Sequence, residues 1–167
     1  MERTREQRFD ELYRRHARAV EAYARRRAPA ALVDDVVAET FVVCWRKLDD
    51  VPADALPWLY SVARKTLANQ RRKRSRELAV GTALQEPALE RDPALGIALA
   101  ALRERDREVL RLVAWEGLSL AEAAAVLGCT SVACRVRFHR AKRRLRAHLD
   151  ELEAPVRPGL DPEGATR

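Results

Sequence analysis

Residues 57–74 read PWLYSVARKTLANQRRKR, a pattern typical of an amphipathic helix. Pro57 suits the first position of a helix, where the missing N–H of proline costs no hydrogen bond. One apolar face is predicted from Leu59, Val62, Ala63, Thr66 and Leu67. A second face carries Trp58, Ser61, Lys65, Asn69, Arg72 and Arg76. Rings and amides can stack on or bond to bases and cations contact phosphates, so this face predicts a nucleic-acid-reading helix. A solvated basic surface with a half-buried tryptophan would give the same pattern.

The composition favours a helical protein that binds a polyanion. The chain has 167 residues, enough for one medium domain or two small ones, and only 5% of them are aromatic. Ala, Leu, Arg and Glu dominate, which favours helices over sheets. The net charge is +7, and residues 64–76 and 131–147 each hold seven Lys or Arg and no acid. Two separated basic helices predict two contacts with one long nucleic acid.

The three cysteines, Cys44, Cys129 and Cys134, do not predict a disulfide framework or a zinc ribbon, because the count is odd and C-x-x-C is absent. Cys44 and Cys134 fall at apolar helical positions and are expected in the core. Cys129, Cys134 and His139 only loosely resemble metal-ligand spacing, so neither a metal nor a cofactor is predicted. The sequence has no secretory h-region and no run of 18 apolar residues. We therefore expect a soluble, cytoplasmic protein without membrane insertion.

The first half of the chain predicts two further helices. A helix over residues 5–28 has the apolar stripe Phe9, Leu12, Tyr13, His16, Val20 and Tyr23. A helix over residues 30–48 buries Val33, Val37, Phe41, Cys44 and Leu48 and leaves Asp35, Glu39, Val42 and Arg46 on another face. That outer face is either ordinary solvated surface or a docking face for a partner helix of complementary charge. The acidic loop 49–56 then leads into the basic helix, where it could hold an unstacked base.

The second half predicts a helix-turn-helix. Asp92-Pro93 is a helix start, and a helix over 104–115 ends before Gly117. Ser119 and Glu122 form a capping box before a short Ala-rich helix that stops at Gly128. The last helix turns Cys134, Phe138, Ala141 and Leu145 inward. Its outward side chains could enter the major groove and contact phosphates, although a structural three-helix bundle would share the pattern.

Taken together, these segments resemble a known family. Residues 34–46 resemble the polymerase-docking segment of extracytoplasmic-function sigma factors, the small two-domain members of the RNA polymerase sigma-70 family. Residues 57–60 and 69–72 resemble the segment that melts and reads the minus-10 promoter element. Residues 107–110, 116–119, 122–124 and 139–142 resemble the region that reads the minus-35 element. The match covers about residues 9–150 in the family's order. Arg103, Cys134 and Val136 depart from the residues common in the family.

The resemblance implies an all-α protein of two small helical domains. Residues 1–78 would form the region 2 helical bundle and residues 93–150 the region 4 helix-turn-helix. Between and after these domains the sequence itself predicts a flexible linker at residues 79–92, where the helical pattern is lost, and a disordered tail at residues 151–167, where Pro and Gly recur. No additional N-terminal region and no folded C-terminal extension are expected.

The resemblance also implies roles for particular residues. The polymerase-binding residues, which would lie in or support the docking surface, would be Asp35, Glu39, Phe41, Val42, Trp45 and Arg46. The minus-10 residues would be Asp50, Asp54, Trp58, Lys65, Asn69, Arg71 and Arg72. The minus-35 residues would be Ser131, Val132, Arg135, Val136, His139, Arg140 and Arg143.

The expected function is therefore that of a sigma factor, which binds core RNA polymerase and directs initiation at promoters. Its partners would be core polymerase, promoter DNA and an anti-sigma factor, without a small-molecule substrate or catalysis of its own. One alternative is a helix-turn-helix regulator that never binds polymerase. Another is an enzyme on nucleic acid with Asp34, Asp35 and Glu39 as metal ligands, for which the sequence offers no paired nucleophile.

Overall fold

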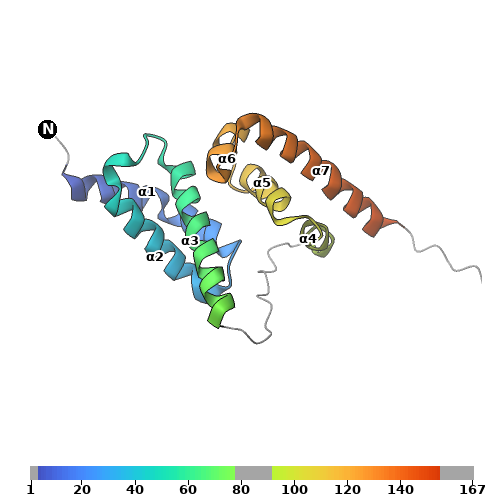
Figure 1. The fold of residues 1–167 in the computed structure, drawn as a ribbon, viewed down its shortest axis with the longest axis horizontal. Helices are drawn as coiled ribbons and strands as arrows, with labels where there is room; N and C mark the ends of the chain where they lie inside the picture. Colours follow the sequence, from blue (N-terminus) through green and yellow to red (C-terminus); the bar gives the residue numbers. More distant parts are fainter. Residues whose placement is uncertain (1–3, 78–91, 155–167) are drawn as a thin grey trace, which may run out of the picture.

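A computed structural model describes residues 4–77 and 92–154, which form seven α-helices and one short 3-10 helix without a strand (Figure 1). The predicted all-α class is confirmed. The first half contains α1 (Arg5–Arg25), α2 (Ala30–Arg46), η1 (Leu48–Asp50) and α3 (Ala55–Glu77). The second half contains α4 (Pro93–Ala100), α5 (Glu104–Ala114), α6 (Leu120–Leu127) and α7 (Ser131–Glu153).

The core of the first half lies where α1, α2 and α3 pack together. On α2 the predicted buried stripe needs a correction, because Val37 is only partly buried whereas Val36 and Thr40 are fully buried. The Thr40 hydroxyl donates a hydrogen bond to the Val36 carbonyl (2.7 Å), so burying it leaves no unsatisfied donor. A helix period of 3.6 places residues 33, 36, 40 and 44 on one stripe just as readily as the predicted set.

The basic helix α3 begins at Ala55, two residues before the predicted start at Pro57. The first four N–H groups of a helix have no intrahelical partner, so proline at the third position also loses no bond. Starting earlier buries Ala55 beside Leu59. The predicted apolar face of α3 is confirmed, since Leu59, Val62, Ala63, Thr66 and Leu67 are all buried.

The second half begins and turns as the sequence predicts. The Asp92 carboxylate accepts hydrogen bonds from the N–H groups of residues 94 and 95 (2.9 and 3.4 Å). Ser119 and Glu122 form the capping box, with bonds of 3.2 and 2.6 Å. Gly117 and Gly128 both have φ near +67°, the left-handed conformation that glycine adopts without strain. Helices α6 and α7 follow one another in the predicted helix-turn-helix order.

The helix α7 continues through Glu153, so the prediction that the disordered tail begins at residue 151 is wrong for residues 151–153. Residues 131–154 contain no Gly or Pro that would break the helix. Pro155 forces only the residue before it out of the helical conformation. Ala154 accordingly has φ −61° and ψ 127°. The predictions for the linker at residues 79–91 and for the tail at residues 155–167 lie outside the described residues.

The two halves pack against each other, with α3 lying against α6 (Figure 1). Their buried apolar side chains form one continuous cluster, in which Leu59 and Leu67 of the first half join Leu112 and Ala123 of the second. None of the helices that the structure describes is long and apolar enough to cross a membrane.

Candidate nucleic-acid and partner interfaces

The outer face of α2 presents most of the residues predicted to bind polymerase. Asp35, Glu39, Val42 and Arg46 follow one another along the helix, and all four are exposed. Val42 is a large apolar side chain with 47% of its surface exposed. The face is thus acidic near one end, apolar in the middle and basic near the other, as the sequence predicts.

Phe41 lies behind this face rather than on it. Its side chain is buried, and its ring contacts the rings of Tyr13 and Phe9, with centroids 4.7 and 6.2 Å apart. Phe41 can therefore fix the position of the α2 face, but it cannot touch a partner while the helix bundle is folded.

Trp45 stands at the C-terminal end of α2 under a guanidinium group from α1. Arg5 lies 5.2 Å from the centroid of the Trp45 ring and donates hydrogen bonds to the Trp45 carbonyl (2.7 Å) and to Asp49 (3.0 Å). The last carbonyls of a helix lack intrahelical partners and carry partial negative charge, so this cation stabilises the end of α2. Trp45 remains partly exposed and continues the face described above.

The residues predicted to read the minus-10 element fall into two groups. Lys65, Asn69 and Arg72 are exposed on one face of α3, and the Asn69 side chain accepts a hydrogen bond from Arg72. Trp58 is half-buried near the start of the same helix. Asp50 and Asp54 are exposed ahead of α3.

Arg71, also predicted to contact the minus-10 element, instead contacts other residues of this chain. Its guanidinium donates hydrogen bonds to the Arg27 carbonyl (2.7 Å) and to Glu104 of α5 (3.0 Å). In this arrangement Arg71 joins the two halves instead of offering its charge to a nucleic acid.

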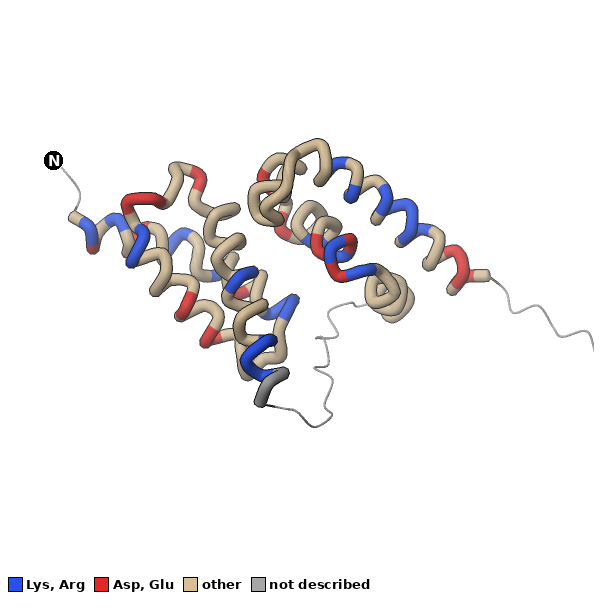
Figure 2. Tube along the Cα trace, in the orientation of Figure 1, with Lys and Arg blue, Asp and Glu red and all other residues tan. Residues whose placement is uncertain are grey.

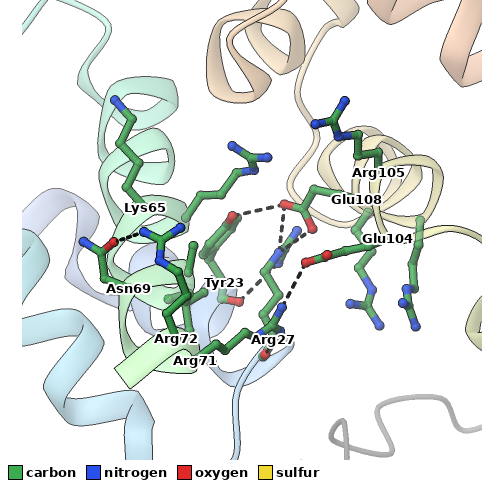
Figure 3. Close-up of a pocket in the computed structure, with 14 residues that line it drawn as sticks. Tyr23, Arg27, Lys65, Asn69, Arg71, Arg72, Glu104, Arg105 and Glu108 are labelled. Atoms are coloured by element: carbon green, nitrogen blue, oxygen red, sulfur yellow. Dashed lines mark hydrogen bonds and ion pairs between the residues drawn. The ribbon is translucent and has the colours of Figure 1, made fainter. Parts of the chain in front are cut away.

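A cleft of about 690 Å³ lies between α3 and α5 (Figure 3). Lys65, Asn69 and Arg72 line its α3 side, and Arg105 and Glu108 line its α5 side. The predicted minus-10 face thus looks across the cleft at the second half of the chain. A nucleic-acid strand seated on α3 would have to share this space with α5.

A buried ion-pair cluster borders the cleft, which three of its members, Tyr23, Arg27 and Glu108, line. We call it the Arg27 cluster; it consists of Arg27, Glu108, Glu116 and Tyr23. The Arg27 guanidinium bonds both oxygens of Glu108 (3.0 Å) and one oxygen of Glu116 (2.8 Å). The Tyr23 hydroxyl donates to Glu108 (3.0 Å), and Arg26 also pairs with Glu116. Residues of α1 and the turn after it therefore hold α5 and the turn that follows it.

Burial and charge act against each other in this cluster. Burial alone lowers the pKa of Arg27, but Glu108, Tyr23 and Glu116 outweigh it and raise the pKa above its ordinary value. Burial, and then the charge of Glu108, raises the pKa of Tyr23 well above its usual range. Arg27 therefore stays charged and Tyr23 neutral at physiological pH.

Sequence reasoning did not find the Arg27 cluster. Its members are separated by up to 93 positions in the sequence, and single arginines and glutamates are common on helix surfaces. Only the packing of the two halves brings them together.

The predicted minus-35 residues are all exposed on α7, whereas Cys134 and Ala141 face the core. Val132 stands out with 73% of its surface exposed next to the turn. Basic residues follow along α7, and acidic residues gather only near its C-terminal end (Figure 2). An apolar side chain near the start of α7 is thus followed by basic side chains. Apolar groups suit contacts with bases, and basic groups suit contacts with phosphates.

In the described parts of the chain no three His, Cys, Asp or Glu residues come together as possible metal ligands. Asp34, Asp35 and Glu39 thus form no such group, and His139 does not join Cys129 and Cys134 in one.

Comparisons with known proteins agree with this geometry. Residues 12–77 match the family described as Sigma-70 region 2, and residues 94–145 match Sigma-70, region 4. The RNA polymerase sigma factor CnrH of Cupriavidus metallidurans is 35% identical over 165 residues, covering 85% of this chain and 86% of CnrH. The ECF RNA polymerase sigma factor SigL of Mycobacterium tuberculosis is 31% identical over 156 residues, covering 84% of this chain and 88% of SigL.

Two solved structures are similar to this one. CnrH in complex with the cytosolic domain of CnrY has a TM-score of 0.64 at 34% identity, covering 86% of this chain and 88% of that one. The sigma factor RpoE in complex with the anti-sigma factor NepR, from Bartonella quintana, has a TM-score of 0.67 at 25% identity, covering 87% of this chain and 98% of that one. With two sigma-70 regions in order and relatives matched over most of their length, the chain belongs to the extracytoplasmic-function sigma factors of RNA polymerase.

Proposed function

We propose that this chain binds core RNA polymerase through the outer face of α2 and directs initiation through α3 and α7. The observation that carries the proposal is the combination of three exposed faces in one sigma chain: a mixed-charge face on α2 and basic faces on α3 and α7. A DNA-binding regulator that ignores polymerase would need only α7, and it would leave Val42 and Trp45 exposed without a role.

The minus-10 contact is assigned to α3 and the loop before it. Lys65, Asn69 and Arg72 would contact the single strand and its phosphates, with Trp58 supplying a ring on which a base can stack. Asp50 and Asp54 would lie beside a base flipped out of the duplex. Binding unpaired bases better than stacked ones supplies the free energy that opens the DNA.

The minus-35 contact is assigned to the exposed face of α7. Val132 and Arg135 near its N-terminus would reach base edges, because an apolar group suits the thymine methyl and a guanidinium suits guanine. Arg140 and Arg143 would contact phosphates, and this part of the affinity should fall steeply with salt.

In this structure the predicted minus-10 face of α3 lies close to the second half of the chain. Arg71 is bonded to Glu104, and the α3 face looks across the cleft at α5. We propose that the two halves separate when the chain binds polymerase, so that α3 and α7 can reach two promoter elements at once. An anti-sigma factor is the proposed partner of the inactive form. RpoE was solved with the anti-sigma factor NepR, and CnrH with the cytosolic domain of CnrY.

Affinity for core polymerase tests the proposal. Asp35→Ala and Arg46→Ala should each weaken the binding of fluorescently labelled protein to purified core enzyme, because both exposed charges would lie in the contact. Asp10→Ala, an exposed acid on α1, is the matched control and should bind normally. Equal affinity of all three variants would argue against the α2 face, and binding to DNA without any binding to core would support the helix-turn-helix regulator instead.

A further inference from the structure

Two cysteines flank the turn of the helix-turn-helix. Thr130 is the N-cap of α7, and its hydroxyl accepts a hydrogen bond from the N–H of Ala133 (3.1 Å). Cys129 is therefore the residue before the cap, and Cys134 is the fourth residue of the helix. These are the two positions whose side chains pack together in a hydrophobic staple.

The two cysteine side chains pack into the same apolar cluster. Cys134 is fully buried, and Cys129 is partly buried and packs against the same apolar cluster. Burial raises the pKa of Cys134, and the neighbouring Cys129 thiol raises it further. Staple positions usually hold large apolar side chains, so two thiols here bring reactive groups into contact where packing alone would not need them.

The two thiols differ in their surroundings. Cys129 is accessible from solvent, and the Arg137 guanidinium lies 3.9 Å from its sulfur. A cation at this place stabilises the negative charge that develops on a reacting cysteine. Cys134 lies behind Cys129 in the core, where solvent does not reach it. An oxidant would therefore meet Cys129 first, with Cys134 next to it.

We propose that Cys129 and Cys134 form an intramolecular disulfide when the protein meets a peroxide. The Cys129 sulfur attacks one peroxide oxygen, the O–O bond breaks, and the other oxygen leaves as water after taking the thiol proton. The Cys134 sulfur then attacks the sulfenic sulfur, the S–S bond forms, and the S–O bond breaks as the departing oxygen takes the Cys134 thiol proton and leaves as a second water. One hydrogen peroxide is reduced to two waters while the two thiols are oxidised to one disulfide.

This cysteine pair fits oxidation better than metal binding. Two thiolates supply only half of a tetrahedral zinc site, and no third His, Cys, Asp or Glu joins them in the described residues. A disulfide needs only two cysteines, which here hold the two staple positions.

The disulfide would act on the start of α7. Its bond length and dihedral requirements are stricter than those of a van der Waals contact, so closing it pulls the turn residue Cys129 toward the first turns of the helix. Ser131 and Val132 lie in that turn and belong to the proposed minus-35 face. Resting on the function proposed above, we infer that oxidation weakens reading of the minus-35 element.

Peptide mapping tests the chemistry without reference to DNA. Trypsin cleaves after Arg111 and Arg135, so Cys129 and Cys134 lie together in the peptide 112–135, while Cys44 lies in the peptide 28–46. After hydrogen peroxide treatment and alkylation, we expect the peptide 112–135 to lose two hydrogens and to take up no alkylating agent. The buried Cys44 should remain an intact thiol that alkylates once the protein is unfolded. Equal oxidation of Cys44, a disulfide between two chains, or sulfinic acid at Cys129 without a disulfide would overturn the proposal.

Two variants separate the chemistry from folding defects. Arg137→Gln leaves both thiols in place and should slow the formation of the disulfide without preventing it. Cys129→Ser should fold normally because its side chain is only partly buried, and it should leave Cys134 reduced. Oxidation of Cys134 in this variant at the wild-type rate would contradict the assigned order of reaction.

The effect on promoter reading needs a second assay. A promoter fragment would be selected from random-sequence DNA with holoenzyme that contains the reduced protein. Oxidation should weaken open-complex formation on this fragment on the order of fivefold, an effect of the size that losing a helix cap has. A thiol reductant should restore open-complex formation, and open-complex formation by Cys129→Ser should not change with peroxide. If the disulfide forms and binding is unchanged, the inferred regulation is wrong; if even reduced protein selects no DNA, the proposed function fails while peptide mapping still decides the disulfide.

Discussion

Replacing Arg27 with methionine removes the cation at the centre of the Arg27 cluster while keeping a side chain of similar length. Arg27 is 4% exposed and faces two carboxylates, Glu108 at 12% and Glu116 at 1%. Removing one partner of a buried ion pair costs about 3–5 kcal/mol, because the other charge is left buried without compensation. Two features reduce the expected loss. Arg26 still pairs with Glu116, and the Arg27 Nη2 atom already lacks a hydrogen-bond partner. We therefore expect a loss of about 3 kcal/mol.

The matched control is Arg25→Met, the same change two residues earlier on α1. Arg25 pairs with Glu21 at the surface, with side chains 65% and 41% exposed, and such pairs contribute roughly 0–1 kcal/mol. Urea unfolding followed by circular dichroism measures the free energy, and small-angle X-ray scattering measures whether the halves separate. Arg27→Met should be less stable, or should expand with its helix content unchanged, because the cluster joins the two halves. If both variants lose the same small amount and neither expands, the Arg27 cluster does not hold the halves together.

Three further changes test separate parts of the account. Ser119→Ala removes the cap of α6 and should lower the free energy of unfolding, measured in urea, by about 1 kcal/mol. An unchanged urea midpoint would contradict this. Burial, and then the charge of Glu116, raises the pKa of Tyr60 to about 12, so the stability from neutral Tyr60 is complete below the ordinary pKa of 10 and is lost as pH rises toward 12. Alkaline titration of a Tyr13→Phe variant, which keeps only the two buried tyrosines, should show ionisation by tyrosinate absorbance together with unfolding by circular dichroism, whereas ionisation near pH 10 in the folded variant would refute this. Arg135→Ala should weaken initiation by about 1–3 kcal/mol only at promoters with a minus-35 element, and Arg146→Ala, farther along α7, should not.

Local signals predicted most of the helices because each depends on residues close in sequence. The Ser119 capping box and the left-handed Gly128 were both predictable, since capping and glycine conformation are set within a few residues. The start of α3 was predicted two residues too late, because proline is accepted throughout the first turn. The end of α7 was predicted too early, because residues 151–153 were grouped with the Pro- and Gly-rich residues that follow them, although these three residues are compatible with a helix.

The candidate faces were predictable to the extent that they follow helical period. All the residues predicted for the minus-35 face of α7 are exposed, as are Asp35 and Glu39 on α2. Phe41 shows the limit of the approach, because a segment resemblance does not separate a residue that touches a partner from one that supports it. Arg71 shows another limit, since its bond to Glu104 depends on how the two halves pack.

The central claim is that this chain gives core RNA polymerase a promoter specificity that the core lacks. Transcription from a genomic DNA library by purified core enzyme, with and without the protein and followed by sequencing of the transcript 5′ ends, tests it most directly. We predict a new set of start sites that share minus-10 and minus-35 elements and that disappear with the Asp35→Ala and Arg46→Ala double variant. Identical start sites with and without the protein would contradict the account.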